Sequence, residues 1–232
     1  MMENENYINW KGWDASSFAF TSNLEKAYFE NIFKLIDLKS SSRILEIGFG
    51  NGSFMGYARD NSHLCDGVES NKNLVNIAIE HEFSVFKSIF EIESNKQYDL
   101  IVLFDVIEHI PKADIQEFIL KIETLLNESG SIFLRFPNGA SPFGLANQHG
   151  DITHCNIITI PKLNYWCHNS NLEITLSRGS VLPFIFQHNY LKMPTKILKL
   201  ILYRLAERFV RFISNQSRGV LSSNLEVVLR KI

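Results

Sequence analysis

The sequence has little of what marks secreted, disulfide-bonded or membrane-spanning proteins. Its 232 residues contain three cysteines, Cys65, Cys155 and Cys167. Their number is odd and their spacing is unpaired, which favours reduced thiols in a cytosol over a disulfide framework or a zinc site. No apolar run reaches membrane-spanning length, and the acidic, polar N-terminus lacks the pattern of a signal peptide. We therefore expect a soluble or peripheral protein of the cytoplasm.

The chain also lacks an excess of basic charge. Lys and Arg number 23 against 25 Asp and Glu, which gives a formal net charge of -2. This balance provides no general positive field, so it does not suggest a nucleic acid as substrate. With 45% apolar residues, the chain is long enough for one α/β domain with a full core and short for two.

What the chain does have is a short apolar run that breaks into glycines. Residues 44–47 are typical of a buried parallel strand, and Gly48, Gly50 and Gly52 follow at alternate positions. Glycine tolerates positive φ and lets a ligand approach the backbone closely, so this stretch predicts a cofactor loop leading into a helix at 53–60. With Glu46 inside the strand, the pattern is Glu-x-Gly-x-Gly-x-Gly. The dinucleotide fingerprint Gly-x-Gly-x-x-Gly, counted from Gly48, has its third glycine one residue beyond Gly52.

A second piece of the same site follows roughly 20 residues after the first glycine. Residues 66–70 predict a second strand that ends in an acid, Glu69. A carboxylate at that position can accept hydrogen bonds from both hydroxyls of a ribose. The two separated pieces in register indicate a nucleotide-containing cofactor.

These motifs resemble the class I S-adenosylmethionine-dependent methyltransferases. The resemblance implies an α/β fold, with a doubly wound, mainly parallel seven-stranded sheet and S-adenosylmethionine as cofactor. In many relatives an acidic residue just after the third strand binds the adenine amino group. This chain has Lys87, Ser88 and Ile89 at that place. Amino-methylating DNA enzymes of this superfamily carry an Asn/Asp-Pro-Pro-aromatic tetrad after the fourth strand. This chain has Phe-Asp-Val-Ile at that place, residues 104–107. The implied cofactor contacts are Glu46, Gly48, Phe49, Gly50, Gly52, Glu69, Ser70, Ser88, Ile89, Asp105 and Val106.

The remaining chain alternates between helical and strand patterns. Ser22 and Glu25 form a capping box that opens the first predicted helix. Five alternations predict a parallel sheet with right-handed crossovers, and the last strand should lie antiparallel beside the sixth. Helices are predicted at 23–37, 73–82, 113–126 and 160–169. Residues 127–130 are predicted to stop the third of these helices. Strands are predicted at 83–86, 98–104, 131–136, 172–177 and 225–229.

We expect a single domain over residues 1–232. Residues 1–40 form an N-terminal aromatic segment and a helix, 41–138 the cofactor-binding core, 139–224 acceptor-side insertions, and 225–232 the last strand. The aromatics of the first segment indicate either a segment held to the body by apolar burial or, as related methyltransferases suggest, a lid over cofactor and acceptor. They are Tyr7, Trp10, Trp13, Phe18 and Phe20.

Residues 195–213 predict a helix with one basic and one apolar face. Two interpretations stay open. The apolar face packs on the body or on a second subunit, giving a homodimer, or the helix makes peripheral contact with the inner face of a membrane. The basic residues are Lys196, Lys199, Arg204, Arg208 and Arg211.

The acceptor side is expected in the loop 138–159, which is too polar for a core. A hydroxyl acceptor must lose a proton, and histidine is the residue type whose pKa suits that task. His154 is the first candidate for the base and is oriented by Asp151, with His149 and His109 as alternatives. The spacing of His149, Asp151 and His154 could bind a metal, but no further ligand is visible, so we predict none.

The leading hypothesis is an enzyme that methylates an oxygen of a small-molecule or carbohydrate acceptor, such as a unit of a surface polysaccharide or a secondary metabolite. Related enzymes that act on sugars carry a similar Asp-x-Thr-His stretch, here residues 151–154. One alternative is a quinone-like or lipid-like acceptor at a membrane. Another is a non-catalytic partner protein that binds the cofactor, since the adenine-binding acid is missing from its usual place.

Overall fold

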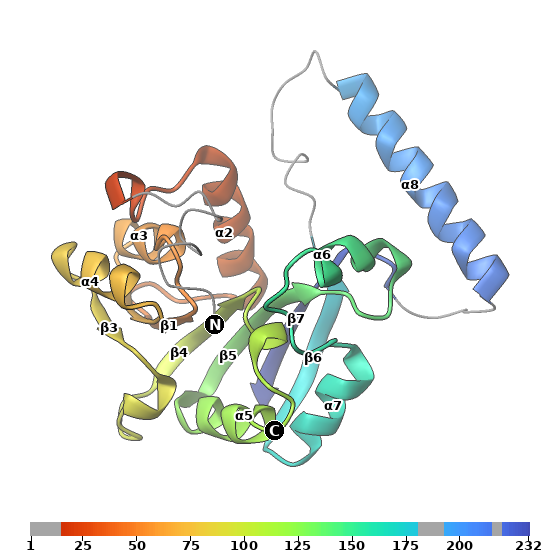
Figure 1. Ribbon diagram of the computed structural model, residues 1–232. Coiled ribbons are helices and arrows are strands. Elements are labelled where there is room, and N and C mark those ends of the chain that lie inside the picture. Colours follow the sequence, from red (N-terminus) through yellow and green to blue (C-terminus); the bar gives the residue numbers. More distant parts are fainter. Residues whose placement is uncertain (1–14, 181–192, 215–219) are drawn as a thin grey trace.

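The structure is a computed structural model that describes residues 15–180, 193–214 and 220–232. Its centre is a seven-stranded sheet in the order β3-β2-β1-β4-β5-β7-β6 (Figure 1). Strands β1 to β5 run parallel, and β7 lies antiparallel between β5 and β6. The predicted doubly wound, mainly parallel sheet is therefore confirmed. The strands are β1 Arg43–Ile47, β2 Leu64–Val68, β3 Ser84–Phe86, β4 Tyr98–Phe104, β5 Leu126–Pro137, β6 Leu172–Gly179 and β7 Asn224–Lys231.

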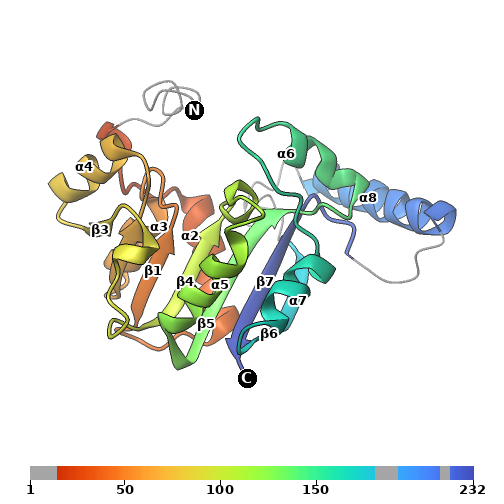
Figure 2. The ribbon, with the colours of Figure 1, turned by 60° about the horizontal axis from the view of Figure 1, so that its bottom comes forward.

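Helices cover both faces of the sheet (Figures 1 and 2). The described α-helices are α2 Asn23–Ile36, α3 Ser53–Asp60, α4 Lys72–Glu80, α5 Ile115–Thr124, α6 Leu145–His149, α7 Ile160–His168 and α8 Met193–Ser214. Short 3-10 turns are η1 Ala15–Ser17, η2 Ile89–Glu91, η3 Ile107–His109 and η4 Pro142–Gly144. The capping box is confirmed, because Ser22 Oγ accepts the Glu25 amide and the Glu25 carboxylate accepts the Ser22 amide.

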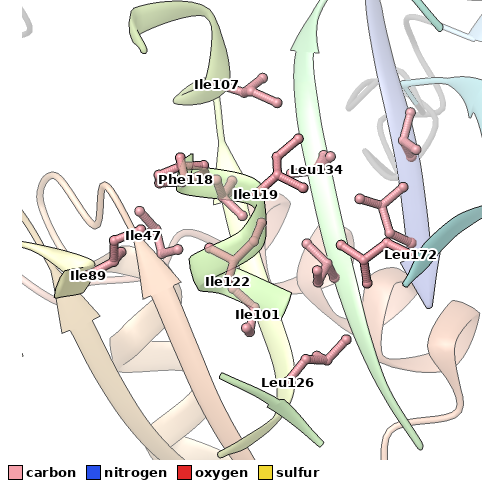
Figure 3. Close-up of a cluster of buried hydrophobic side chains, with 14 of the residues drawn as sticks. Ile47, Ile89, Ile101, Ile107, Phe118, Ile119, Ile122, Leu126, Leu134 and Leu172 are labelled. Atoms are coloured by element: carbon pink, nitrogen blue, oxygen red, sulfur yellow. The ribbon is translucent and has the colours of Figure 1, made fainter. Parts of the chain in front are cut away.

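Alternate residues of the central strands serve two separate cores. On one face, Ile101 and Leu103 of β4 belong to a buried cluster with α5 and α7; on the other, Leu100 and Val102 pack with α2 and α3. Figure 3 shows Ile119 and Ile122 of α5 among the strand side chains of the first cluster. This burial on both faces explains the unbroken apolar runs, because each strand residue is covered from one side or the other.

Several predicted boundaries differ from the structure. The second strand was expected at 66–70, but β2 ends at Val68, so Glu69 and Ser70 follow it; the Glu69 carboxylate bonds the Asn71 amide in the turn. The predicted stop at 127–130 lies within β5, where the register with β4 shifts between Tyr98 and Leu100. The stop was wrong because a polar, glycine-containing bulge resembles a turn in sequence.

The loop at 138–159 is more buried than expected. It contains η4 and α6, and Asn138, Gln148, Asp151 and Asn156 are buried polar residues. The judgement that it was too polar for a core was wrong for these positions, and protein partners replace water for some of their polar atoms, although Gln148 Oε1 and Asn156 Nδ2 have no hydrogen-bond partner among the described residues. Asn138 Nδ2 donates to the Val220 carbonyl at 2.7 Å, and Gln148 Nε2 donates to the Asn156 carbonyl at 3.3 Å.

Helix α8 lies apart from the sheet in Figure 1. Its apolar residues Ile197, Leu202, Phe209 and Phe212 are 51%, 56%, 64% and 84% exposed. The structure therefore does not show this face packed on the body of the protein. That arrangement was one part of the first interpretation of 195–213, whose other part was packing on a second subunit. Among the described residues, no helix is both long and apolar enough to cross a membrane.

The N-terminal aromatics are only partly covered by the structure. Tyr7, Trp10 and Trp13 lie outside the described residues. Phe18 is buried at 6% exposure and Phe20 is 68% exposed. The idea that aromatic burial holds this segment to the body is correct for Phe18.

Candidate active site

A cleft of about 590 Å³ lies where β1, β2 and β4 end. It brings together predicted site residues from three separate parts of the chain. These are Glu46, Gly48, Phe49, Gly50, Glu69, Ser70, Asp105, Val106 and His109, and further lining residues include Glu25, Tyr28, Asn71, Arg135 and Thr153. Ligands of open α/β sheets bind at this edge.

The loop after β1 requires glycine for two reasons. Gly48 and Gly52 have φ values of +73° and +71°, which residues with a side chain adopt at a cost. A β-carbon on Gly48 would lie 2.5 Å from Val106 Cγ2, and one on Gly52 would lie 2.7 Å from Phe18 Cζ. The loop is thus clamped between the end of β4 and the N-terminal segment. Gly52 supports the loop and does not line the cleft.

Glu69 holds the loop from the end of β2. One carboxylate oxygen accepts the Gly50 amide at 3.3 Å, and the other accepts the Asn71 amide at 2.9 Å. The side chain borders the cleft, so it can accept further bonds there. This is the geometry that a ribose-binding carboxylate needs.

Glu46 presents a buried carboxyl group to the same cleft. The residue is 4% exposed, and within the described part of the chain its Oε2 has no hydrogen-bond partner. Burial raises the pKa of Glu46 well above its usual value, the Glu69 carboxylate raises it further, and the Met55 backbone amide and Arg135 lower it in part. A buried oxygen without a partner costs free energy, so this group is suited to a ligand that donates a hydrogen bond.

Asp105 and Arg135 form a polar pair that lines the cleft. Asp105 has a φ of +56°, and both of its oxygens accept from the Arg135 guanidinium. The guanidinium also lies 5.6 Å from the ring centroid of Tyr28, whose hydroxyl donates to Glu226 at 3.0 Å. Arg135 and Tyr28 were not predicted as site residues. The sequence feature that could have indicated Arg135 is a single basic residue within an otherwise largely apolar predicted strand.

The cleft is also lined by His109 and Thr153. Thr153 Oγ1 donates to Asp151 Oδ1, so it must accept at 3.0 Å from His109 Nδ1. Asp151 was expected to orient His154. Its Oδ1 instead fixes Thr153, through which it orients His109, and its Oδ2 lies 4.0 Å from His154 Nε2.

His154 lies behind the cleft, next to Glu108. Its Nδ1 is 2.9 Å from the Gln148 carbonyl, which can only accept, so Nδ1 carries the hydrogen and Nε2 faces Glu108 Oε1 at 3.8 Å. Backbone bonds from Cys155 and Asn156 to the Glu108 carbonyl, 3.1 Å and 3.0 Å long, hold the two segments together. Burial, followed by the nearby Asp105 carboxylate, raises the pKa of Glu108 to about 8.

The other predicted site residues lie elsewhere. Ser88 caps η2 by accepting the Phe90 amide, and Ile89 is buried in the core cluster of α5. His149 is exposed at the end of α6. None of these three lines the cleft, and the predicted contact between the cofactor and Ser88 or Ile89 stays a prediction.

Comparison with known proteins identifies the class of protein. A family model described as a methyltransferase domain matches residues 20–177, so the chain belongs to the methyltransferase-domain family. The chain is also 26% identical over 120 residues to a probable (S)-tetrahydroprotoberberine N-methyltransferase 2 of Papaver bracteatum. That match covers 47% of this chain and 33% of the relative, so it spans about a third of the relative's length.

Solved structures of methyltransferases share the fold. A SAM-dependent methyltransferase from Archaeoglobus fulgidus superposes with a TM-score of 0.62 at 17% identity, covering 98% of this chain and 99% of that one. Mitomycin 7-O-methyltransferase superposes with a TM-score of 0.57 at 11% identity, covering 89% and 54%. Since relatives of both the N- and the O-methylating kind are found, the acceptor atom does not follow from the comparisons.

The residues of the cleft fit S-adenosylmethionine, the cofactor of this family. Glu69 can accept hydrogen bonds from ribose hydroxyls, the positive-φ loop can let a cofactor lie against backbone, and the unpartnered Glu46 oxygen can accept a donor. When bound, the cofactor supplies a methyl group on a positively charged sulfur. The chain carries a methyltransferase domain over residues 20–177, and the residues of its cleft are suited to binding and orienting such a cofactor.

Proposed function

We propose that this methyltransferase methylates a hydroxyl oxygen of a small-molecule or carbohydrate acceptor. The observation that supports this is the division of the cleft. The glycine loop and Glu69, joined through the Gly50 amide, line one part of the cleft, and His109 and Thr153, joined through His109 Nδ1, line another. The acceptor then lies at the His109 end, with its oxygen directed toward the sulfonium.

Methyl transfer is an in-line displacement, so most of the acceleration comes from holding the two reactants close and aligned. The new oxygen–carbon bond forms as the carbon–sulfur bond breaks, the sulfur keeps the electron pair, and the acceptor oxygen gives up its proton. The acceptor end of the site must lower the pKa of that hydroxyl or receive its proton. The His109 imidazole, held through Thr153, is the titratable side chain that lines this end.

His109 therefore takes the position that the sequence suggested for His154. The side chain of His154 is only 7% exposed and does not line the cleft, so it acts through its neighbours and not on the acceptor directly. His149 is exposed and separate from the cleft. Carbohydrate acceptors are favoured because their hydroxyls match a wall made of Asp105, Arg135 and Thr153.

The test is a methyl-transfer screen with labelled cofactor over sugars, phosphorylated sugars, quinols and amines. We expect turnover with a hydroxyl acceptor, and His109→Ala should lower kcat by roughly 10²- to 10⁴-fold without changing the Kd for the cofactor. His168→Ala, an exposed histidine at the end of α7, is the matched control. Turnover of amines alone would refute the oxygen acceptor. A chain that binds the cofactor but methylates none of these acceptors would favour the alternative of a non-catalytic partner protein, and a chain that never binds the cofactor would refute both enzymatic proposals.

The exposed apolar face of α8 favours a second candidate, a lipid-like or quinone-like acceptor at a membrane. The helix carries one acid, Glu207, against five basic residues. A helix with an exposed apolar face and a net positive charge complements an anionic lipid surface. We therefore assign its apolar face to the surface of an anionic membrane.

Vesicle sedimentation tests this assignment. Each basic residue near an anionic surface contributes about 1 kcal/mol, so changing Lys199, Arg204 and Arg208 to Glu should abolish binding to anionic vesicles at low salt and leave turnover of a soluble acceptor intact. Neutral vesicles are the control. Wild-type protein that ignores vesicles and sediments as a dimer in ultracentrifugation would assign the face to a second copy of the chain.

A further inference from the structure

The most unusual group near the cleft is the carboxylate of Glu108. Its side chain is 0% exposed, and neither oxygen has a hydrogen-bond partner among the described residues. Leaving a buried polar atom unpaired costs about 1–3 kcal/mol, and more for a charged group. The nearest guanidinium, that of Arg135, is bonded to Asp105. A site that keeps such a carboxylate is suited to binding something that the protein itself does not supply.

Two imidazoles lie beside this carboxylate. His154 Nδ1 is committed to the Gln148 carbonyl, so the lone pair of the neutral ring is on Nε2, which faces Glu108 Oε1 at 3.8 Å. That distance is too long for a hydrogen bond. The ring of His109 lies 4.6 Å from the ring of His154, centroid to centroid.

The spacing of these three groups suits a metal ion. One ligand atom from each of Glu108, His109 and His154 can be chosen so that all lie within 4.8 Å of one another. Two ligands of a tetrahedral zinc, each about 2.0–2.2 Å from the metal, are roughly 3.4 Å apart. The 3.8 Å between Glu108 and His154 is close to this value, and a small rotation of the side chains completes the set.

We propose that Glu108, His109 and His154 bind a first-row divalent cation, with Zn²⁺ the best match, at the acceptor end of the cleft. Two imidazoles and one carboxylate are a known zinc set with an open fourth position, and imidazole disfavours Mg²⁺ and Ca²⁺. The sequence-based expectation of no metal site considered a different set, in which His149 is exposed.

The cation explains what the acceptor end does, and this part rests on the proposed function. His109 lines the cleft while Glu108 and His154 lie behind it, so the open position faces the acceptor. A hydroxyl bound there becomes more acidic and is held in place, and its proton passes to water at the mouth of the cleft. The metal would thus lower the hydroxyl pKa, which is one of the two ways in which the proposed function allows the proton to be lost.

Metal binding can be measured without any acceptor. Protein stripped with a chelator should bind one Zn²⁺ in competition with a chromophoric chelator, and one Co²⁺ with visible absorption bands. Loss of an outer-shell partner already costs roughly 10- to 100-fold in affinity, so Glu108→Gln and His154→Ala should each cost at least about 100-fold. Both variants are checked for folding by circular dichroism.

His149→Ala is the matched control for metal affinity, because it removes a histidine from the same loop but not from the set. Unchanged affinity is expected. An equal loss in His149→Ala, or Zn²⁺ binding that Glu108→Gln leaves intact, would overturn the proposed ligands. Wild-type protein that binds neither Zn²⁺ nor Co²⁺ would overturn the site itself.

The two proposals can fail separately. Stripped protein that methylates a hydroxyl acceptor at the full rate would overturn the catalytic use of the metal and leave the proposed function standing. Metal-loaded protein that binds one Zn²⁺ through Glu108 but methylates no hydroxyl acceptor would refute the proposed function and leave the metal site standing.

Discussion

Replacing Glu69 should weaken cofactor binding more than the loss of any other single carboxylate. The side chain is fixed at the end of β2 by the amides of Gly50 and Asn71, 3.3 Å and 2.9 Å away, and needs no rearrangement to accept a ribose. Each charge-assisted hydrogen bond contributes about 1.5–3 kcal/mol. Taking the lower value for two hydroxyls gives about 3 kcal/mol, or an increase in Kd of about 100-fold for Glu69→Ala.

Isothermal calorimetry with S-adenosylmethionine measures this change, with circular dichroism to confirm folding. Glu25→Gln is the control, since Glu25 also lines the cleft but its carboxylate is engaged by Ser22, and glutamine keeps that capping box. The control should stay within about threefold of wild type. A folded Glu69→Ala variant with wild-type affinity would show that the ribose does not lie at the end of β2.

Three further changes test the loop, the buried acid and the N-terminal segment. Gly48→Ala should lower the free energy of unfolding by about 1–2 kcal/mol from positive φ alone, and adding Val106→Ala, which removes the clash, should restore part of the further loss in urea titrations. In Glu46, burial raises the folded-state pKa above the usual 4.5, so the stability it contributes is present below about pH 4.5 and is lost as the pH rises toward the folded pKa. Glu46→Gln should therefore gain on wild type by up to about 1.4 kcal/mol per pH unit above about pH 4.5, and a difference that stays constant with pH would contradict this. Phe18→Ala should cost about 3 kcal/mol in the same titrations, because its ring is buried against Gly52, and a loss below about 1 kcal/mol would show that the segment is not held there.

The fold was largely predictable because its signals are local. The run at 98–104 was predicted with the bounds that β4 has, since every position except Asp99 is apolar or aromatic. Positions 127–130 were missed because a bulge and a turn use the same residue types. The helix at 195–213 was predictable from its periodicity, but the surroundings of its apolar face were not, because periodicity does not say what covers a face.

The candidate site was likewise predictable where its signals are local and not where they depend on contacts between distant residues. The glycine loop and Glu69 are contiguous motifs, and the structure places both on the cleft. The pairing of Glu108 with His154 depends on two backbone hydrogen bonds, from Cys155 and Asn156 to the Glu108 carbonyl, that span 47 and 48 residues and that no spacing rule reveals. Arg135 was hidden for a related reason, because its partner Asp105 follows the neighbouring strand β4 and is 30 residues away in the sequence.

The segment that carries α8 leaves the sheet after β6 and returns at the start of β7. Gly179 pairs with Leu225 across these strands, and the Ser180 amide donates to the Asn224 carbonyl at 3.0 Å. The two ends are therefore adjacent, and to the sheet the whole excursion is equivalent to one hairpin turn. Because closing a loop costs only about 0.6 kcal/mol more for each doubling of its length, segments of very different size fit between the same two strands. In evolution such a segment can be gained, exchanged or lost in a single step without disturbing the strands that form the cleft.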